Sequence, residues 1–191
     1  MFDEGQIKQR VGELADEISE GVGGERPFLI GVLSGSVVFL SDLVRRLDLD
    51  ADVDFMAVSS YAGQDPSGVV RITKDLDASI ENRDVVVVED VIDTGLTLNY
   101  LLRNLENRNP KNIRVCTLID KPTRRIPQIE LHHVGFEVED YVVGYGLDFQ
   151  GLYRNLPFIL AITDLRQLAQ RPGALKEAIA SGDIKGMRKT R

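Results

Sequence analysis

The sequence predicts an α/β protein with a doubly wound, mainly parallel sheet, flanked by helices and joined by a small hood lobe. Residues 84–97 read DVVVVEDVIDTGLT, and the four valines at 85–88 are apolar without alternation. Both faces of that strand must therefore be covered, as in the middle of a parallel sheet. Strand-like and helix-like segments then alternate along the chain, which is typical of βαβ units. We therefore place residues 85–88 at the centre of the sheet.

The segments before this strand are a helix, a strand–turn–helix unit and a further strand. Apolar residues recur at helical spacing in 3–20, and glycines follow. Residues 28–32 form a short apolar strand, and the turn 33–36 leads into a second helix. Residues 53–59 form the next strand. The stretch SYAGQDPSG at 60–68 has no apolar period, so it predicts a long loop.

The segments after the central strand continue this pattern and then change. Leucines spaced as in a helix follow Thr97, and residues 112–119 form another buried strand. From Lys121 onward, prolines and glycines separate short strands, which predicts a lobe over the mouth of the sheet. We expect one domain over 1–164, with hood elements from the N-terminal region and from 121–164. Residues 165–191 are expected to form a helical C-terminal extension.

Composition and charge narrow the class of protein. The chain has 191 residues and a net charge of -7, whereas proteins that coat nucleic acids are usually basic. The lone cysteine, Cys116, excludes an internal disulfide and suits a reducing compartment. No run approaches the ~20 apolar residues that a membrane span requires, and the polar N-terminus lacks the apolar core of a signal peptide. We expect a cytoplasmic protein without nucleic-acid or membrane partners.

Three acids and a small turn follow the central strand. Adjacent Glu89 and Asp90 repel each other unless a cation or hydroxyl donors offset their charge, and Mg²⁺ is the natural guest. The turn from Asp93 to Thr97 opens a helix, whose free N–H groups and positive dipole end favour a phosphate. An isolated DTG could instead be a helix cap with solvated acids. Four valines before three acids and a second threonine favour a functional site.

These segments resemble a known family. EDVIDTGLT is similar to the phosphoribosyl-pyrophosphate signature of type I phosphoribosyltransferases. VDFMAVSSYAG, ITKDLD, LIDKPTRR and YVVGYGLDFQGLYRNLPFI resemble motifs of the hypoxanthine phosphoribosyltransferase family. The likeness extends from about Phe28 to about Ile162. It implies a purine salvage enzyme that converts hypoxanthine or guanine and phosphoribosyl pyrophosphate to the nucleoside 5′-monophosphate and pyrophosphate, with Mg²⁺ as cofactor.

The resemblance also implies roles for the acidic residues and the turn. Glu89 and Asp90 would hold the ribose hydroxyls, directly or through Mg²⁺, and Asp93 would be the general base near purine N7. A base that loses a ring proton needs such an acceptor nearby. The 5′-phosphate would lie against Asp93 and the four residues after it: Thr94, Gly95, Leu96 and Thr97.

Purine contacts are implied in the second part of the chain. Lys121 would donate to the 6-oxygen, and because an ammonium cannot accept a hydrogen bond, it selects against the 6-amino group of adenine. Tyr141 would stack on the purine, and the backbone of Val142 would bond to its edge. Asp148 would lie near the purine 2-position and the pyrophosphate metal, so that the implied metal ligands are Glu89, Asp90 and Asp148.

The pyrophosphate contacts implied by the family are the loop Leu33, Ser34 and Gly35 together with Arg125 and Arg154. Many relatives carry a basic residue where this chain has Ser34. Because the family loop often holds a strained peptide, we predict a cis bond between Leu33 and Ser34. Ser60 and Tyr61 resemble the tip of the family's closing loop, which keeps water from the activated ribosyl carbon. Lys74 either supports that loop or faces solvent.

Two other functions remain open on the sequence alone. One is a regulator that kept the fold to bind nucleotide and RNA, although the acidic charge and the joint presence of Asp93, Lys121 and Asp148 oppose it. The other is a relative that prefers xanthine or adenine. Family members are commonly dimers or tetramers, so we expect a homo-oligomer.

Overall fold

Strand β4 (Asp84–Ile92) is the centre of the fold in this computed structural model, which describes residues 2–60, 70–162, 165–170, 173, 175 and 177. The side chains of Ser60 and Gln167 are not described. Within these ranges six strands form one sheet in the order β3-β2-β1-β4-β5-β6. The other strands of this sheet are β1 (Phe28–Leu33), β2 (Asp52–Ser60), β3 (Val70–Lys74), β5 (Asn112–Asp120) and β6 (His133–Glu137).

Parallel pairing holds this sheet together except at one edge. β4 pairs with β1 on one side and β5 on the other, and β1 pairs with β2 and β5 with β6, all in parallel. Only β3 runs antiparallel, beside β2. The strand order reverses between β1 and β4, so the ends of these two strands define the crevice where ligands bind in open α/β sheets.

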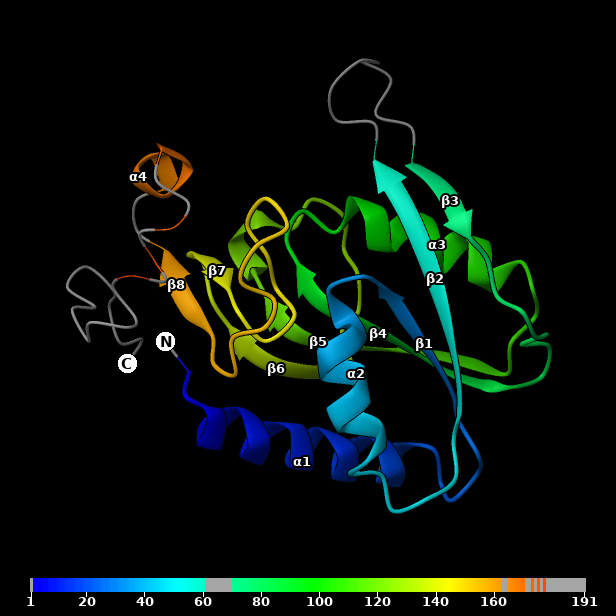
Figure 1. Cartoon of the computed structure of the whole chain (residues 1–191). Coiled ribbons are helices and arrows are strands. Elements are labelled where there is room, and N and C mark those ends of the chain that lie inside the picture. The colour runs from blue at the N-terminus through cyan, green and yellow to red at the C-terminus, as the bar shows by residue number, and fades with distance from the viewer. Residues whose placement is uncertain are drawn as a thin grey trace.

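The valines of β4 divide between two cores. Val86 and Val88 pack with α1 (Glu4–Gly21) and α2 (Ser36–Val44), whereas Val85 and Val87 pack with α3 (Leu96–Glu106). All four valines are fully buried. Figure 1 shows α1 and α2 on one side of the sheet and α3 on the other. Helices therefore cover both faces of β4, as a buried parallel strand requires. The predicted doubly wound α/β fold is confirmed.

Helix α1 forms where its apolar period begins. Asp3 caps it, since the Asp3 carboxylate accepts from the Gln6 amide at 2.9 Å and the Gln6 side chain accepts from the Asp3 amide at 3.0 Å. The helix ties itself to β6, because Arg10 donates to the carbonyls of Val134 and Gly135 at 2.8 and 3.1 Å. Glu17 lies 3.3 Å from His133 Nδ1 on the same strand.

One strand departs from the prediction. The sequence assigns residues after Lys121 to a lobe over the sheet, but β6 lies in the main sheet, paired with β5. β6 is an edge strand, and three of its five residues are half-buried. Its sequence, HVGFE, therefore has neither the continuous apolar run of a central strand nor a clear alternation, and the sequence pattern does not reveal it. His132 and His133 are structural here, because His132 Nδ1 accepts from the Val115 amide at 3.2 Å.

The hood lobe is built from the remaining elements. β7 (Tyr141–Val143) and β8 (Leu160–Ile162) pair antiparallel, and Phe2 bridges to Ile159 beside them. A separate apolar cluster links this lobe to α4 (Leu165–Gln170), with Leu168 and Leu175 packed near Tyr153. The rest of the predicted C-terminal extension lies outside the described residues.

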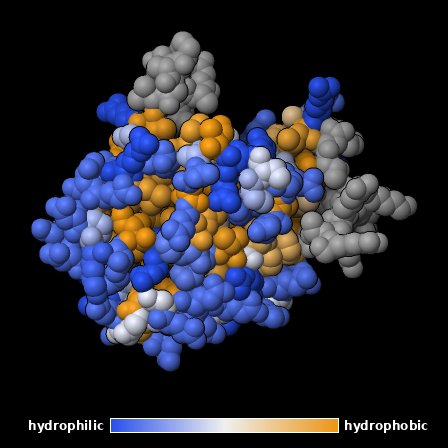
Figure 2. All heavy atoms as spheres, turned by 180° about the vertical axis from the view of Figure 1, so that it is seen from behind, coloured by the Kyte–Doolittle hydropathy of each residue, from blue (hydrophilic) through white to orange (hydrophobic). Residues whose placement is uncertain are grey.

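The surface of the molecule mixes apolar and charged areas. Figure 2 shows apolar side chains gathered in the middle of the face opposite to that of Figure 1, bordered by polar ones. Leu96, Tyr100 and Ile126 are among the exposed large apolar residues. None of the helices in the described part of the chain has the length and apolar character needed to cross a membrane.

We expect the packing of α3 on β4 to contribute strongly to stability. Leu101 is fully buried in the α3 core, whereas its neighbour Tyr100 is 38% exposed. Leu101→Ala should lower the free energy of unfolding by about 2–5 kcal/mol, because it leaves a cavity, and Tyr100→Ala by no more than about 0.5 kcal/mol. Urea unfolding of both variants measures the difference. Equal losses would show that α3 does not depend on this buried face.

Candidate active site

The ends of β1 and β4 meet at Gly35 and Asp90. A Cβ atom on Gly35 would lie 1.5 Å from Asp90 Oδ2, so only glycine leaves room for that carboxylate. The peptide bond between Leu33 and Ser34, just before it, is cis, as predicted from the resemblance. Ser34 is exposed and Gly35 buried. The loop after β1 therefore lies directly against an acid of β4.

Glu89 and Asp90 are adjacent acids near the end of β4, and their surroundings disfavour the charged form of each. Burial and the neighbouring Asp90 charge raise the pKa of Glu89 well above 4.5. Burial raises the pKa of Asp90 to about 6, against the opposing effects of the Val91 amide, 2.9 Å from Asp90 Oδ1, and the Arg154 guanidinium. In the described part of the chain the Glu89 carboxylate has neither a hydrogen bond nor an ion pair, although its backbone pairs with β5. These acids consequently favour a cation or hydroxyl donors.

The turn between β4 and α3 forms a small pocket. Gly95 adopts φ +76°, the left-handed region, and lets α3 begin at Leu96. A pocket of about 120 Å³ is lined by Glu89, Asp93, Thr94, Gly95 and Thr97, with three apolar neighbours. The first N–H groups of a helix have no partner within it and form an anion site together with nearby hydroxyls.

Asp93 pairs with one cation of the turn after β5 and acts electrostatically on a second. Arg124 Nε is 2.8 Å from Asp93 Oδ1, an ion pair without hydrogen-bond geometry, since this oxygen accepts no hydrogen bond in the described residues. Lys121 is 3% exposed, and its Nζ lies 5.6 Å from the centre of the Tyr141 ring. Burial lowers the pKa of Lys121, while the Asp93 charge acts in the opposite direction. Acceptor, donor and aromatic ring thus surround one site.

Residues of the hood lobe complete this cluster and contact the loop after β1. Arg154 pairs with Asp148 at 2.8 Å and donates to the Gly146 carbonyl at 2.6 Å. A Cβ on Gly146 would lie 2.4 Å from the Gly35 carbonyl oxygen, so the hood loop rests on the loop after β1. Tyr141 donates from its hydroxyl to the Asp148 carbonyl at 2.9 Å. Val142 is buried beside it in β7.

Other predicted site residues have no contact with this cluster in the structure or lie outside the part that it describes. Arg125 contacts its own loop, with Nε 3.4 Å from Asp120 Oδ1 and Nη1 donating to the Ile129 carbonyl at 3.1 Å. Ser60 is the last residue of β2, and Tyr61 lies outside the described residues. Asp148 does not join Glu89 and Asp90 in a group of three metal-binding side chains, and no such group occurs in the described residues.

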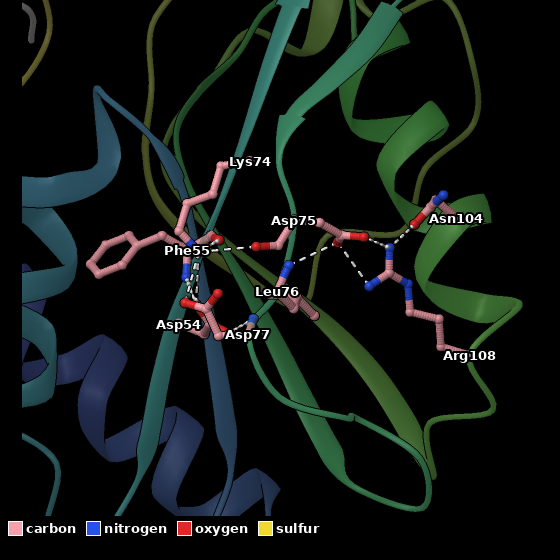
Figure 3. Close-up of polar contacts among 8 residues, drawn as sticks. All are labelled: Asp54, Phe55, Lys74, Asp75, Leu76, Asp77, Asn104 and Arg108. Carbon is pink, nitrogen blue, oxygen red and sulfur yellow. Dashed lines mark hydrogen bonds and ion pairs between the residues drawn. The ribbon is translucent and has the colours of Figure 1, made fainter.

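Lys74, whose role the sequence left open, ties β3 to β2. Its ammonium lies 3.3 Å from Asp54 Oδ1 and 3.2 Å from Asp77 Oδ2, and it donates to the Phe55 carbonyl at 3.1 Å. Figure 3 shows these residues converging, with Arg108 of the segment after α3 reaching Asp75. Burial opposes ionisation of Asp54, but the amides of Phe55 and Asp77 and the Lys74 charge lower its pKa overall. Lys74 therefore supports the β2–β3 pair.

Three contributors were not found from the sequence. The sequence alone assigns no role to Arg124 or to Gly146. Glu139 accepts from the Thr123 amide and hydroxyl at 3.1 and 2.5 Å, which joins the turn after β5 to the segment before β7. The spacing LIDKPTRR marks the two arginines but does not show which of them faces the acids.

Known proteins resemble this chain in sequence over most of its length. Residues 1–150 match the phosphoribosyl transferase domain. The hypoxanthine-guanine phosphoribosyltransferase of Mycobacterium avium is 49% identical over 162 residues, 81% of this chain and 80% of that protein. That of Bacillus subtilis is 46% identical over 161 residues, 83% of this chain and 89% of that protein.

A solved structure agrees with the sequence matches. The hypoxanthine-guanine phosphoribosyltransferase of Bacillus anthracis superposes with a TM-score of 0.81 at 42% identity, covering 85% of this chain and 97% of that one. The chain therefore belongs to the phosphoribosyltransferase family. Within that family, the proteins it matches here are hypoxanthine-guanine phosphoribosyltransferases, so the resemblance seen in the sequence is confirmed.

The raised pKa of Asp90 predicts a pH effect on stability. A carboxyl with a higher pKa in the folded state stabilises the fold when protonated, so this contribution is complete below about pH 4 and is lost as pH rises through about 6. Asp90→Asn removes that loss. The free energy of unfolding of Asp90→Asn minus that of the native protein should therefore be roughly 1–3 kcal/mol larger at pH 7 than at pH 4.

Urea unfolding in a magnesium-free buffer with a chelator measures this difference. Asp48→Asn, at an exposed position, is the matched control and should follow the native protein across the same range. Parallel curves for the native protein and Asp90→Asn would contradict the assigned burial of this carboxyl.

Proposed function

We propose that this chain is a hypoxanthine-guanine phosphoribosyltransferase that transfers the ribosyl 5′-phosphate of phosphoribosyl pyrophosphate to a 6-oxopurine. The observation that carries this proposal is that Asp93 lines the pocket of the turn from Asp93 to Thr97, here called the phosphate turn, while its charge also acts on the Lys121 ammonium. One carboxylate is thereby shared by a sugar-phosphate site and a purine site. The names of the relatives support the same reaction.

The donor would bind along β4. The N–H groups at the start of α3 and the hydroxyls of Thr94 and Thr97 would hold the 5′-phosphate. Glu89 and Asp90 would accept hydrogen bonds from the ribose hydroxyls, which would give the Glu89 carboxylate a partner and add to the hydrogen bond that Asp90 accepts from the Val91 amide. The loop at Leu33 to Gly35 and Arg154 would face the pyrophosphate, with Ser34 supplying backbone groups and no charge.

The purine would lie between Tyr141 and the Asp93 carboxylate. The ammonium of Lys121 donates to the 6-oxygen and cannot accept from a 6-amino group, so adenine is excluded. The bond between purine N9 and C1′ forms as the bond from C1′ to the pyrophosphate oxygen breaks, and the pyrophosphate leaves with the electron pair. The proton of purine N7 passes to Asp93.

The donor set at the end of β4 fits Mg²⁺. Glu89 and Asp90 are adjacent carboxylates, and the described residues bring no third acid to them. Mg²⁺ commonly binds through one or two carboxylates, substrate oxygens and water, so a two-acid site suits a metal that arrives with the pyrophosphate donor. When bound, the ion would offset the charge that develops on the leaving pyrophosphate. Asp148, paired with Arg154, would be available to it only through water or the pyrophosphate.

The direct test is product formation from each base. Purified protein with phosphoribosyl pyrophosphate and Mg²⁺ should yield nucleotide from hypoxanthine and from guanine, and none from adenine, as followed by chromatography. Chelating the metal should abolish turnover. A regulator that only senses nucleotide would give no product with any base, and dominant turnover of xanthine would favour the second alternative. The homo-oligomer and the cytoplasmic location expected from the sequence stay predictions.

Asp93 is expected to act on the chemical step. Asp93→Asn should lower kcat by about 10²- to 10⁴-fold, because the amide cannot take the purine proton. The dissociation constant for phosphoribosyl pyrophosphate, measured by calorimetry, should stay within about twofold because the phosphate turn is intact. Asp50→Asn, at an exposed position, is the control. An equal loss of donor binding would refute this division of roles.

Gly35 is expected to govern donor binding through Asp90. Gly35→Ala puts a methyl group where the Asp90 carboxylate lies, so the acid or the loop must move. We expect the affinity for phosphoribosyl pyrophosphate to fall at least about 10-fold, the size of one lost charged hydrogen bond. Gly12→Ala, whose Cβ would lie 3.6 Å from its nearest neighbour, is the matched control and should bind normally. Unchanged affinity in Gly35→Ala would remove this contact from the donor site.

A further inference from the structure

We propose that Arg124 is a positioning residue that holds the Asp93 carboxylate through Oδ1 and leaves Oδ2 to accept the purine proton. This inference rests on the proposed function. Oδ1 is buried and lies 2.8 Å from Arg124 Nε, yet the Asp93 side chain is 41% exposed. The exposed part of the side chain must therefore lie away from Oδ1, which leaves the other carboxylate oxygen open toward the site.

Arg124 and Asp93 are fixed to a common backbone unit. Arg124 ends a single turn of 3₁₀ helix, Pro122–Arg124, and its amide donates to the Lys121 carbonyl at 3.0 Å. On either side of that turn, the Lys121 amide donates to the Ile92 carbonyl and the Ile126 amide to the Thr94 carbonyl, both at 3.0 Å. The residues that accept these two bonds are the neighbours of Asp93 in the chain. The backbone that carries Arg124 is therefore fixed to the backbone on both sides of Asp93.

A second contact fixes the turn from the hood side. Glu139 accepts two hydrogen bonds from Thr123, the residue before Arg124, and these bonds lower the pKa of Glu139. Glu139 stands two residues before Tyr141, the start of β7. The turn that carries Arg124 is thus held between the phosphate turn and the aromatic ring that would stack on the purine.

The pairing also decides what Lys121 can do. Lys121 has no ion pair with any described residue, and burial lowers its pKa although the Asp93 charge acts in the opposite direction. Because Arg124 already neutralises Asp93 at Oδ1, the Lys121 ammonium remains over the Tyr141 ring and available to a 6-oxygen. The two cations therefore have separate tasks: Arg124 orients the acceptor, and Lys121 contacts the base.

Arg124→Met tests this assignment, because methionine fills a similar volume without the charge or the fork of donors. We expect kcat with hypoxanthine to fall about 10- to 100-fold, the cost of a misplaced catalytic group, while KM for phosphoribosyl pyrophosphate stays within about twofold. Arg124→Lys should recover part of that loss. Arg26→Met is the matched control, because Arg26 pairs with Asp52 where β2 begins, and it should keep native kinetics.

A double-mutant cycle separates positioning from a general structural effect. If Arg124 acts only through Asp93, then Arg124→Met combined with Asp93→Asn should be no slower than Asp93→Asn alone, within about threefold. Urea unfolding establishes that each variant is folded. Should Arg124→Met fail to fold, Arg124→Lys in the same cycle gives the same test with a smaller loss.

Several results would overturn the proposal. Native or faster turnover in Arg124→Met would show that the arginine merely plugs the free site, and full additivity with Asp93→Asn would show that it acts elsewhere. A rise in the donor KM alone would place it in pyrophosphate binding. These results refute the positioning role while native activity persists. Absence of nucleotide from the native protein would instead refute the proposed function.

Discussion

The close approach of the Asp90 carboxylate to the Gly35 backbone is the contact on which the site depends. It joins the loop after β1 to the end of β4 at the point where the strand order reverses. A side chain on Gly35 would separate these two strand ends, and Gly146 places the hood loop on the same backbone. One crowded position thus sets the distance between the residues that would hold pyrophosphate and those that would hold ribose.

The same region holds charges that the ligand-free fold does not offset. Glu89 and Asp90 are close together and largely removed from water, and burial raises the pKa of both. Such groups cost stability at neutral pH, and carboxyls with raised pKa values cluster at functional sites. A cation and ribose hydroxyls would supply partners for these carboxylates. Ligand binding would then offset the stability that the fold loses by burying them.

The turn after β5 organises the side of the site where we propose that the purine binds. Its backbone is bonded to the phosphate turn, and Thr123 is bonded to Glu139 of the hood. Lys121 and Arg124 then project from one short segment toward the purine site and the Asp93 carboxylate, respectively. The geometry of acid, lysine and aromatic ring is consequently set by the backbone more than by flexible side chains, which is what orientation of a proton transfer requires.

The sequence by itself determined the fold class and indicated most residues of the proposed site. The four valines before Glu89 required a sheet covered on both faces, and the acids, Gly95 and Thr97 marked a phosphate turn, because these features are periodic or adjacent in the chain. Tertiary structure alone decided that β6 joins the main sheet, that Gly35 must admit Asp90, and that Arg124, not Arg125, meets Asp93. Local residue spacing encodes which face of a segment is buried. It does not encode how two loops distant in the chain pack together, because that depends on the shape of everything between them.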